Sequence, residues 1–325
     1  MSSFWKNKKV LVTGGAGFIG SHLVEILVAA DADVTVPVRS LKGKSRYLDS
    51  QCPQIKVVDA DLMDFNSCLK LTEGQDVVMN LAATVGGIEF NLQRPAFIFR
   101  ENLQVFMNVI EAARCCAVER LLVTSSACVY PRFCSIPTPE DEGFKERPEP
   151  SNEGYGWAKR MEEFLGMAYL REYGTQVAIA RPYNAYGPRD NFDPSSSHVI
   201  PALIRRIVGG ENPLIVWGDG SQSRSFLYVT DFARGLMEVA EKYAVGDAVN
   251  IGSDEEVTIA DLSRMIVELS GTDASIEFDT SKPMGQPRRK CDTAKAKANV
   301  GYESKVPLRE GLAKTIDWYR GECLQ

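Results

Sequence analysis

The sequence predicts an α/β fold, in which a doubly wound parallel sheet is followed by a smaller, mixed α/β C-terminal lobe. Three observations predict it. Short apolar runs alternate with helical patterns as far as Pro182, a glycine-rich segment joins the first run to the first helical pattern, and the alternation stops after Pro182. Strands that alternate with helices form parallel sheets with helices on both faces, since each helix buries its apolar side against the sheet.

The strands of the predicted sheet are short apolar runs bounded by turn residues or charges, which is typical of buried strands. They are Lys9–Thr13, Val34–Val38, Ile55–Val58, Asp76–Leu81, Arg120–Ser125 and Gln176–Arg181. Helical patterns lie between several of these runs. They are Gly17–Ala30, Phe65–Thr72, Pro95–Cys116 and Tyr155–Tyr173.

The C-terminal lobe begins with a change in composition. Residues 183–215 are rich in Pro, Ser, Asn and Gly and contain one helical segment, Pro201–Val208. A strand and a helix over Phe226–Lys242 are expected to return to the first domain, and two helical patterns after Thr258 flank the loop Lys282–Arg289. The expected domains are residues 1–182 with about 226–257, and residues about 183–225 with 258–325.

The bulk composition excludes several classes of protein. The chain has 325 residues, 44% of them hydrophobic, and a net charge of −6 without a dense Lys/Arg tract, so nucleic acid is not an expected partner. It has no run of about 18 apolar residues and no signal-peptide pattern, so no membrane association is expected. The eight cysteines lack metal-ligand spacing and there are only two histidines, which predicts reduced cysteines, no metal and a cytoplasmic location.

The glycine-rich segment after the first strand reads GGAGFIG over residues 14–20 and fits both GxGxxG and GxxGxxG. Glycines let backbone N–H groups approach a pyrophosphate, and the start of the following helix adds a partial positive charge. The strand–loop–helix context favours a dinucleotide-binding loop of a Rossmann-type fold over a tight turn that only packs closely. The residues expected to contact the cofactor here are Gly14, Gly17, Phe18, Ile19 and Gly20.

The end of the second predicted strand carries basic residues, whereas NAD enzymes usually place an acidic residue there to hold the ribose 2′-hydroxyl. Arg39, Lys42 and Lys44 suit the 2′-phosphate of NADP, so we expect NADP, with NAD as the alternative. A solvated basic loop would explain the same residues without a ligand. The residues expected beside the cofactor at the ends of the third and fourth strands are Asp61, Leu62, Leu81, Ala82 and Ala83.

A serine, a tyrosine and a lysine form a candidate catalytic set. Tyr155 and Lys159 are four residues apart, so they lie on one face of the predicted helix. A nearby ammonium favours the tyrosinate, which makes the tyrosine a usable proton shuttle. Ser126 follows the strand Arg120–Ser125, where its hydroxyl can bond a substrate carbonyl. A YxxxK pattern also occurs by chance in amphipathic helices, but the order of glycine loop, serine and YxxxK is much more specific.

Four segments carry a family resemblance: TGGAGFIG (13–20), TSSACVYP (124–131), YGWAK (155–159) and RPYNAYGP (181–188). They resemble the extended short-chain dehydrogenase/reductases that act on nucleotide sugars, and the resemblance runs over nearly the whole chain. It implies a nicotinamide cofactor, a nucleotide-sugar substrate and Ser126, Tyr155 and Lys159 as catalytic residues. It also implies an active-site-supporting Asn102 beside the cofactor and a homodimer formed through the two long helices.

Cys128 narrows the chemistry that this resemblance implies. Sugar 4,6-dehydratases of the family carry an Asp-Glu pair where this chain has Ala127 and Cys128, so dehydration is disfavoured. The segment 125–131 is similar to that of GDP-mannose 3,5-epimerase, whereas residues 191–206 and 281–288 resemble GDP-L-fucose synthase. In both relatives a cysteine and a second group epimerise C3 and C5 of a 4-keto sugar, and here that pair would be Cys128 and His198.

Such a pair is chemically reasonable. A modest base can remove a proton next to a ketone when the enolate is stabilised, and inversion needs a proton donor on the opposite face. Ser126 and Tyr155 would stabilise the enolate oxygen. Without the resemblance, Cys128 would be read as a small buried apolar residue, His198 as a hydrogen-bonded loop histidine and His22 as structural.

Cations and polar groups of the lobe are expected to anchor the substrate, because an arginine can donate two hydrogen bonds to phosphate. Arg224 matches a family position at the nucleotide diphosphate, Lys282 and Arg288 lie in the loop that covers it, and Arg205 and Arg206 could instead be a solvated helix face. The expected substrate-binding residues are Val85, Gly86, Asn184, His198, Val199, Arg206, Trp217, Arg224, Lys282 and Arg288.

The predicted function is therefore that of a nucleotide-sugar 3,5-epimerase/4-reductase, acting on a 4-keto GDP-sugar with NADPH. The alternatives are a redox-neutral 3,5-epimerase or 4-epimerase that keeps and regenerates NAD, and a catalytically silent protein that senses the cofactor. A 4-epimerase would not need Cys128 or His198. The intact Ser126, Tyr155 and Lys159 argue against the silent protein.

Overall fold

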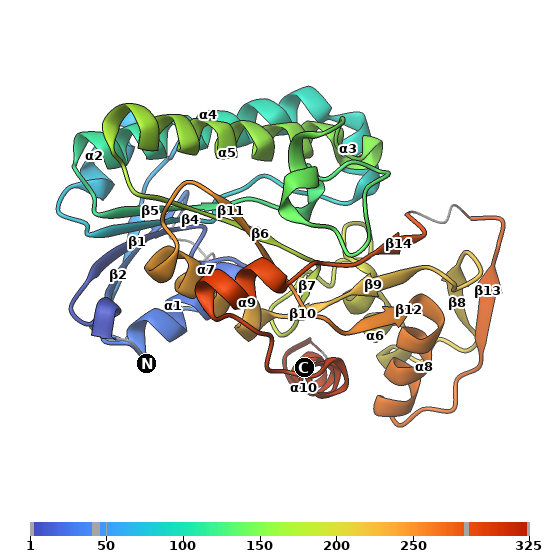
Figure 1. Ribbon diagram of the computed structural model, residues 1–325. Helices are drawn as coiled ribbons and strands as arrows, with labels where there is room; N and C mark the ends of the chain where they lie inside the picture. Colours follow the sequence, from blue (N-terminus) through green and yellow to red (C-terminus); the bar gives the residue numbers. More distant parts are fainter. Residues whose placement is uncertain (1–2, 41–45, 50, 283–285, 324–325) are drawn as a thin grey trace.

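The computed structural model of the chain describes residues 3–40, 46–49, 51–282 and 286–323. Its centre is a seven-stranded parallel sheet with the order β11-β6-β5-β4-β1-β2-β3 (Figure 1). The strands are β1 Lys9–Thr13, β2 Asp33–Val38, β3 Ile55–Asp59, β4 Val77–Asn80, β5 Arg120–Thr124, β6 Val177–Pro182 and β11 Ala248–Ile251. The chain runs outward from β1 in both directions, which is the doubly wound arrangement.

Helices cover both faces of this sheet (Figure 1). One face carries α2 Phe65–Thr72, α4 Pro95–Cys115 and α5 Glu153–Tyr173, and the other carries α1 Phe18–Val28, α7 Val229–Lys242 and α9 Ala294–Val300. Two clusters of buried apolar residues fill the spaces between the sheet and these layers. The predicted α/β fold class is thereby confirmed.

The C-terminal lobe packs three helices around short strands, with its own apolar core. Its helices are α6 Val199–Val208, α8 Ile259–Leu269 and α10 Leu308–Cys323. It also contains two two-stranded sheets, β8 Leu214–Trp217 with β13 Ile276–Asp279 and β7 Ala185–Tyr186 with β10 Leu227–Tyr228. A third sheet has three strands, in which β9 Ser223–Ser225 lies between β12 Glu256–Thr258 and β14 Arg288–Arg289. Short elements elsewhere are α3 Ile88–Gln93 and the 3₁₀ helices η1 Ser3–Trp5, η2 Ala127–Val129, η3 Glu140–Phe144 and η4 Pro150–Asn152.

The six predicted strands of the sheet are confirmed within one residue at either end. The seventh strand, β11, was not predicted; it lies at the edge of the sheet and pairs only with β6. The prediction of two helices after Thr258 was wrong, since α8, α9 and α10 all lie there. The domain division stays a prediction, although α9 packs against β11 and α7 and so joins the first part of the fold.

The carboxyl ends of the parallel strands all point to one edge of the sheet, where ligands of open α/β folds bind. Thr13, Asn80, Thr124 and Pro182 end β1, β4, β5 and β6 at this edge. The loops that follow carry the glycine-rich segment, residues 81–87 and residues 125–131. No helix of the described residues is long and apolar enough to cross a membrane.

Candidate active site

The glycine-rich loop is built from residues that could not carry a side chain. Gly14 has a φ of +69°, and a Cβ on it would lie 2.9 Å from the carbonyl carbon of Leu81. A Cβ on Gly20 would overlap the carbonyl oxygen of Gly14, because α1 starts directly against the loop. These contacts keep the loop between the ends of β1 and β4.

The first turn of α1 has free backbone donors. Gly17 is the N-cap residue and makes no side-chain bond to the N–H groups that follow. The amides of Phe18 and Ile19 therefore have no side-chain acceptor, and a helix start with free N–H groups suits a phosphate. The loop and these donors fit the pyrophosphate of a dinucleotide, which Gly14, Gly17, Phe18 and Ile19 would hold.

Two buried polar side chains shape the segment after β4. The hydroxyl of Thr13 donates to Asn80 Oδ1 at 2.7 Å and accepts from the backbone N–H groups of Leu81 and Ala82 at 3.1 Å. Asn102, which is 2% exposed, donates to the carbonyl of Thr84 and accepts from its N–H, both at 2.9 Å. Asn102 thus lies beneath the segment and holds it, while Ala83 is exposed above.

The end of β2 presents an exposed cation. Arg39 is exposed, and no ion pair joins it to any described residue. Lys42 and Lys44, which were predicted to add to its charge, lie outside the described residues. Asp61 is exposed after β3 and accepts from the N–H of Met63, while the carbonyl of Leu62 accepts from Asn108 Nδ2 at 2.9 Å.

Tyr155 and Lys159 lie in the first two turns of α5, beside η2. The Lys159 ammonium is 5.6 Å from the centre of the Tyr155 ring. A Cβ on Gly156 would lie 2.5 Å from the carbonyl oxygen of Cys128, so η2 packs directly on this face of α5. The pKa of Tyr155 is raised to about 12, mainly by burial; Lys159 opposes this shift, and the neighbouring Cys128 and Glu162 add to it. The structure therefore brings Tyr155, Lys159 and Cys128 together.

Ser126 caps η2, since its hydroxyl accepts from the N–H of Cys128 at 3.1 Å. The preceding Ser125 donates to Glu163, and Arg181 of β6 binds the same carboxylate with distances of 2.8 and 2.7 Å. Arg181 is 3% exposed. This buried network fixes the turn that carries Ser126 and Cys128 against both β6 and α5.

His198 lies at the start of α6, on the lobe side of the site. His198 is exposed to solvent. Nearby protein still removes part of the water around its imidazole, and this desolvation lowers the pKa of the side chain. The loop before it meets the segment after β4, since a Cβ on Gly87 would lie 3.7 Å from Cα of Ser196. Val85, 56% exposed, and Gly86 belong to that segment, and Val199 follows the histidine.

Two arginines that were predicted to bind substrate are already engaged in ion pairs. Arg206 binds the carboxylate of Glu211 and donates to the carbonyl of Ile215 at 2.7 Å. Arg288 binds both oxygens of Glu256, at 2.6 and 2.8 Å, and its side chain is 51% exposed. In the free protein these guanidinium groups are therefore neutralised within the chain.

The neighbouring Arg289, which the sequence did not single out, faces the site instead. It pairs in register with Arg224 across β14 and β9, and it donates to the carbonyl of Ala127 beside Cys128. Burial and Arg289 lower the pKa of Arg224 to about 10. Among the described residues, no carboxylate pairs with either arginine. Two adjacent cations without a counter-ion strongly favour a dianionic ligand.

Of the remaining predicted substrate residues, Asn184 lies next to the arginine pair, while Trp217 and Lys282 contact each other on the lobe. Asn184 Nδ2 donates to the carbonyl of Ser225 at 2.8 Å, which ties the end of β6 to β9. Trp217 is 59% exposed, and the Lys282 ammonium lies 5.8 Å from its ring centre. An exposed indole under a flexible cation is a surface on which a flat ring can stack.

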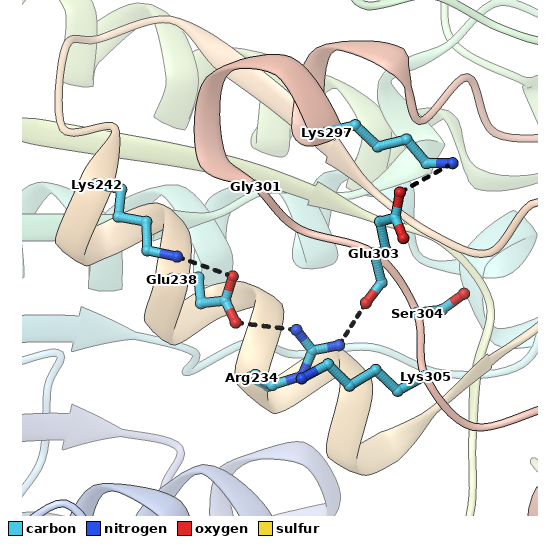
Figure 2. A pocket seen from close by; sticks show the side chains of 8 residues that line it. All are labelled: Arg234, Glu238, Lys242, Lys297, Gly301, Glu303, Ser304 and Lys305. Carbon is cyan, nitrogen blue, oxygen red and sulfur yellow. Dashed lines mark hydrogen bonds and ion pairs between the residues drawn. The ribbon is translucent and has the colours of Figure 1, made fainter. Parts of the chain in front are cut away.

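A surface pocket between α7 and the segment after α9 lies apart from this site (Figure 2). It is lined by Arg234, Glu238, Lys242, Lys297, Gly301, Glu303, Ser304 and Lys305. Glu238 pairs with Arg234 at 2.9 Å and with Lys242 at 3.2 Å, and Glu303 pairs with Lys297 at 3.4 Å. Acids therefore pair with three of the four cations that line the pocket, whereas neither Arg224 nor Arg289 has an acidic partner among the described residues.

The chain matches the NAD dependent epimerase/dehydratase family over residues 10–252. It is 37% identical to GDP-L-fucose synthase 1 of Arabidopsis thaliana over 319 residues, which cover 97% of this chain and 94% of that protein. It is 33% identical to dTDP-4-dehydro-6-deoxy-D-allose reductase of Streptomyces bikiniensis over 325 residues, 97% of either chain. The UDP-glucose 4-epimerase of Thermotoga maritima, solved with UDP-glucose, has a TM-score of 0.86 at 28% identity and covers 98% of this chain and 100% of that one.

Proposed function

Since this chain belongs to the NAD dependent epimerase/dehydratase family, we propose that it is a 3,5-epimerase/4-reductase of the GDP-L-fucose synthase type. Its substrate is a nucleotide-activated 4-keto sugar, with GDP as the expected nucleotide. The observation that carries the proposal is the position of Cys128, whose backbone carbonyl packs against Gly156 next to Tyr155 and whose neighbour Ala127 gives its carbonyl to Arg289. Its thiol would be the acid/base group. The full-length similarity to GDP-L-fucose synthases supports it.

When bound along the glycine-rich loop, a nicotinamide cofactor would supply the hydride for reduction at C4 of the sugar. In this proposal Tyr155 donates its proton to the C4 oxygen, and the Lys159 ammonium stabilises the tyrosinate that remains. Ser126 donates a hydrogen bond to the same oxygen. Before the reduction, Cys128 and His198 remove and return the protons at C3 and C5 from opposite faces, while Ser126 and Tyr155 stabilise the enolate oxygen.

The arginine pair would hold the nucleotide diphosphate. We expect Arg289→Met to raise KM for the nucleotide sugar by about 10- to 100-fold, because a hydrogen bond between charged groups contributes about 1.5–3 kcal/mol. Steady-state kinetics check this expectation. Arg288→Met is the matched control, since Glu256 already neutralises that side chain. An effect of equal size for the two variants would contradict the assignment.

NADP is the expected form of the cofactor, because Arg39 is an exposed cation at the end of β2 that has no acidic partner among the described residues. We expect Arg39→Asp to lower kcat/KM for NADPH by about 100-fold relative to NADH, since the change removes a phosphate-binding charge and adds a carboxylate that can hold a ribose hydroxyl. Kinetics with the two cofactors measure the ratio. An unchanged ratio would show that Arg39 does not select the cofactor.

A single assay tests the proposed function. Purified protein is incubated with GDP-4-keto-6-deoxymannose and NADPH, and the absorbance of the reduced nicotinamide is followed. Stoichiometric oxidation of NADPH supports the proposal, and its absence rules out net reduction. Incubation of GDP-mannose and catalytic NAD⁺ in deuterated water then tests the alternative, since label at C3 and C5 without net redox change indicates a redox-neutral epimerase.

The homodimer, the two-domain division and the cytoplasmic location remain predictions. Large apolar side chains support the dimer, because Phe97 and Met107 of α4 and Phe164 of α5 are exposed by 39%, 38% and 51%. Exposed apolar side chains on two adjacent long helices are suited to pack against a second copy.

A further inference from the structure

A buried carboxyl group binds the lysine beneath Tyr155. Glu162 follows Lys159 by three residues on α5, and its Oε2 accepts a hydrogen bond from the Lys159 ammonium at 2.9 Å. The side chains of Glu162 and Lys159 are 1% and 2% exposed, respectively. Residues three and four apart share one side of a helix, so Tyr155, Lys159 and Glu162 line the same face of α5. Water is excluded from this pair, which strengthens its attraction.

The other charged groups near the pair do not bond to the lysine. Glu163, the next residue of α5, binds Arg181 of β6 through both of its oxygens and adds only a weaker, longer-range attraction for Lys159. Cys128 of η2 and Glu162 both act on Tyr155, and each raises its pKa. Among the described residues, Glu162 is therefore the carboxylate that binds the Lys159 ammonium directly.

This compensation decides the protonation of the lysine. Burial opposes the charge of Lys159, but Glu162, with smaller contributions from Tyr155 and Glu163, outweighs it, and the pKa of Lys159 is raised above its ordinary value. Burial raises the pKa of Glu162 to about 7, although Lys159 pulls it down. A buried lysine without such a partner loses its proton several units earlier.

We propose that Glu162 is a positioning residue that fixes the Lys159 ammonium beneath Tyr155 and keeps it protonated during the reaction. When Tyr155 gives its proton to the C4 oxygen, the O–H bond of the phenol breaks and a negative charge remains on the tyrosinate. The ammonium that Glu162 holds in place stabilises this charge. The inference rests on the proposed function only in the role that it gives to Tyr155.

The first test uses the cofactor-free protein and no substrate, so it is independent of the proposed activity. Lysine side chains are labelled with ¹³C, and the Cε resonance of Lys159, identified by its loss in Lys159→Arg, is followed against pH. In the wild-type protein Lys159 should stay charged above the ordinary lysine pKa of about 10.4. In Glu162→Gln its midpoint should fall by about two units or more.

Glu172→Gln is the matched control, since it removes the same charge from an exposed position near the end of α5. It should leave the Lys159 midpoint unchanged. If Glu162→Gln does not fold, the titrations of the wild-type protein and of Glu162→Asp, which keeps the charge, still test whether the carboxylate keeps Lys159 protonated. A wild-type midpoint below the ordinary lysine value, or an equal midpoint in folded Glu162→Gln, would overturn the proposal.

The second test is the pH profile of kcat. Glu162 gains a proton as the pH falls through about 7, so the wild-type enzyme should show an acid-side decline there that Glu162→Gln lacks. On the alkaline side the variant should lose activity at least one pH unit earlier than the wild type. A uniform fall in kcat without a change in the profile would reduce Glu162 to a structural role.

Discussion

Tyr155→Phe should lower the rate of 4-keto reduction by about 10²–10⁴-fold, because the variant keeps the ring but has no proton for the C4 oxygen. The ring of Tyr155 packs on the Lys159 ammonium, so Phe preserves the shape of the site and its folding. Cofactor binding should change little, since the glycine-rich loop lies on other elements. The measurement is the oxidation of NADPH under single-turnover conditions, which reports hydride transfer and not product release.

The same variant should separate the two halves of the reaction. In the proposed mechanism Cys128 and His198 exchange the C3 and C5 protons with deuterated solvent, so Tyr155→Phe should retain part of this exchange while reduction is lost. Ser126 would still donate to the enolate oxygen. A variant that reduces the 4-keto sugar at more than about a tenth of the wild-type rate would show that another group protonates C4.

Cys128→Ser is expected to have the complementary effect. A serine hydroxyl is a far weaker base than a thiolate, so deuterium incorporation at the inverted carbons should fall by about 10²-fold or more. Direct reduction of the unepimerised 4-keto sugar should continue, because Tyr155 and Lys159 are unchanged. Mass spectrometry of the sugar in deuterated water gives the exchange, and NADPH absorbance gives the reduction.

The prediction for Cys128→Ser has two controls, the preserved shape of the turn and the variant Cys134→Ser. Ser is nearly isosteric with Cys, and the backbone N–H of residue 128 still donates to Ser126, so the turn should keep its shape. Cys134→Ser, which changes a thiol outside the site, should exchange at the wild-type rate. Full exchange in Cys128→Ser would rule out the thiol as the acid/base group.

Much of the sheet was predictable because its strands are short buried runs between clear turn signals. β11 was missed, since its four residues form a strand only beside β6. α9 was missed because seven residues complete barely two turns, and it is held by packing against β11 and α7. Tertiary contacts that the local sequence does not contain decide both elements.

The candidate site was predictable where a motif ties residue type to position, as at Gly14, Gly20, Tyr155 and Lys159. Motifs could not tell Arg288 from Arg289, because the choice depends on which way the strand β14 faces. Successive residues of a strand point to opposite sides, so Arg288 meets Glu256 and Arg289 meets Arg224. If a strand had been predicted over Arg288 and Arg289, this alternation would have told the two arginines apart. The roles of the site residues remain predictions that the variants above test.

Arg224 on β9 and Arg289 on β14, which have no acidic partner among the described residues, also affect the stability of the ligand-free protein. Two like charges held side by side lower the free energy of unfolding. The ligand-free protein is therefore less stable because it keeps these two charges in place to bind its ligand. A dianion that binds between them removes the repulsion and stabilises the folded state by mass action. The amount of folded enzyme in the cell would then rise and fall with the supply of its own substrate.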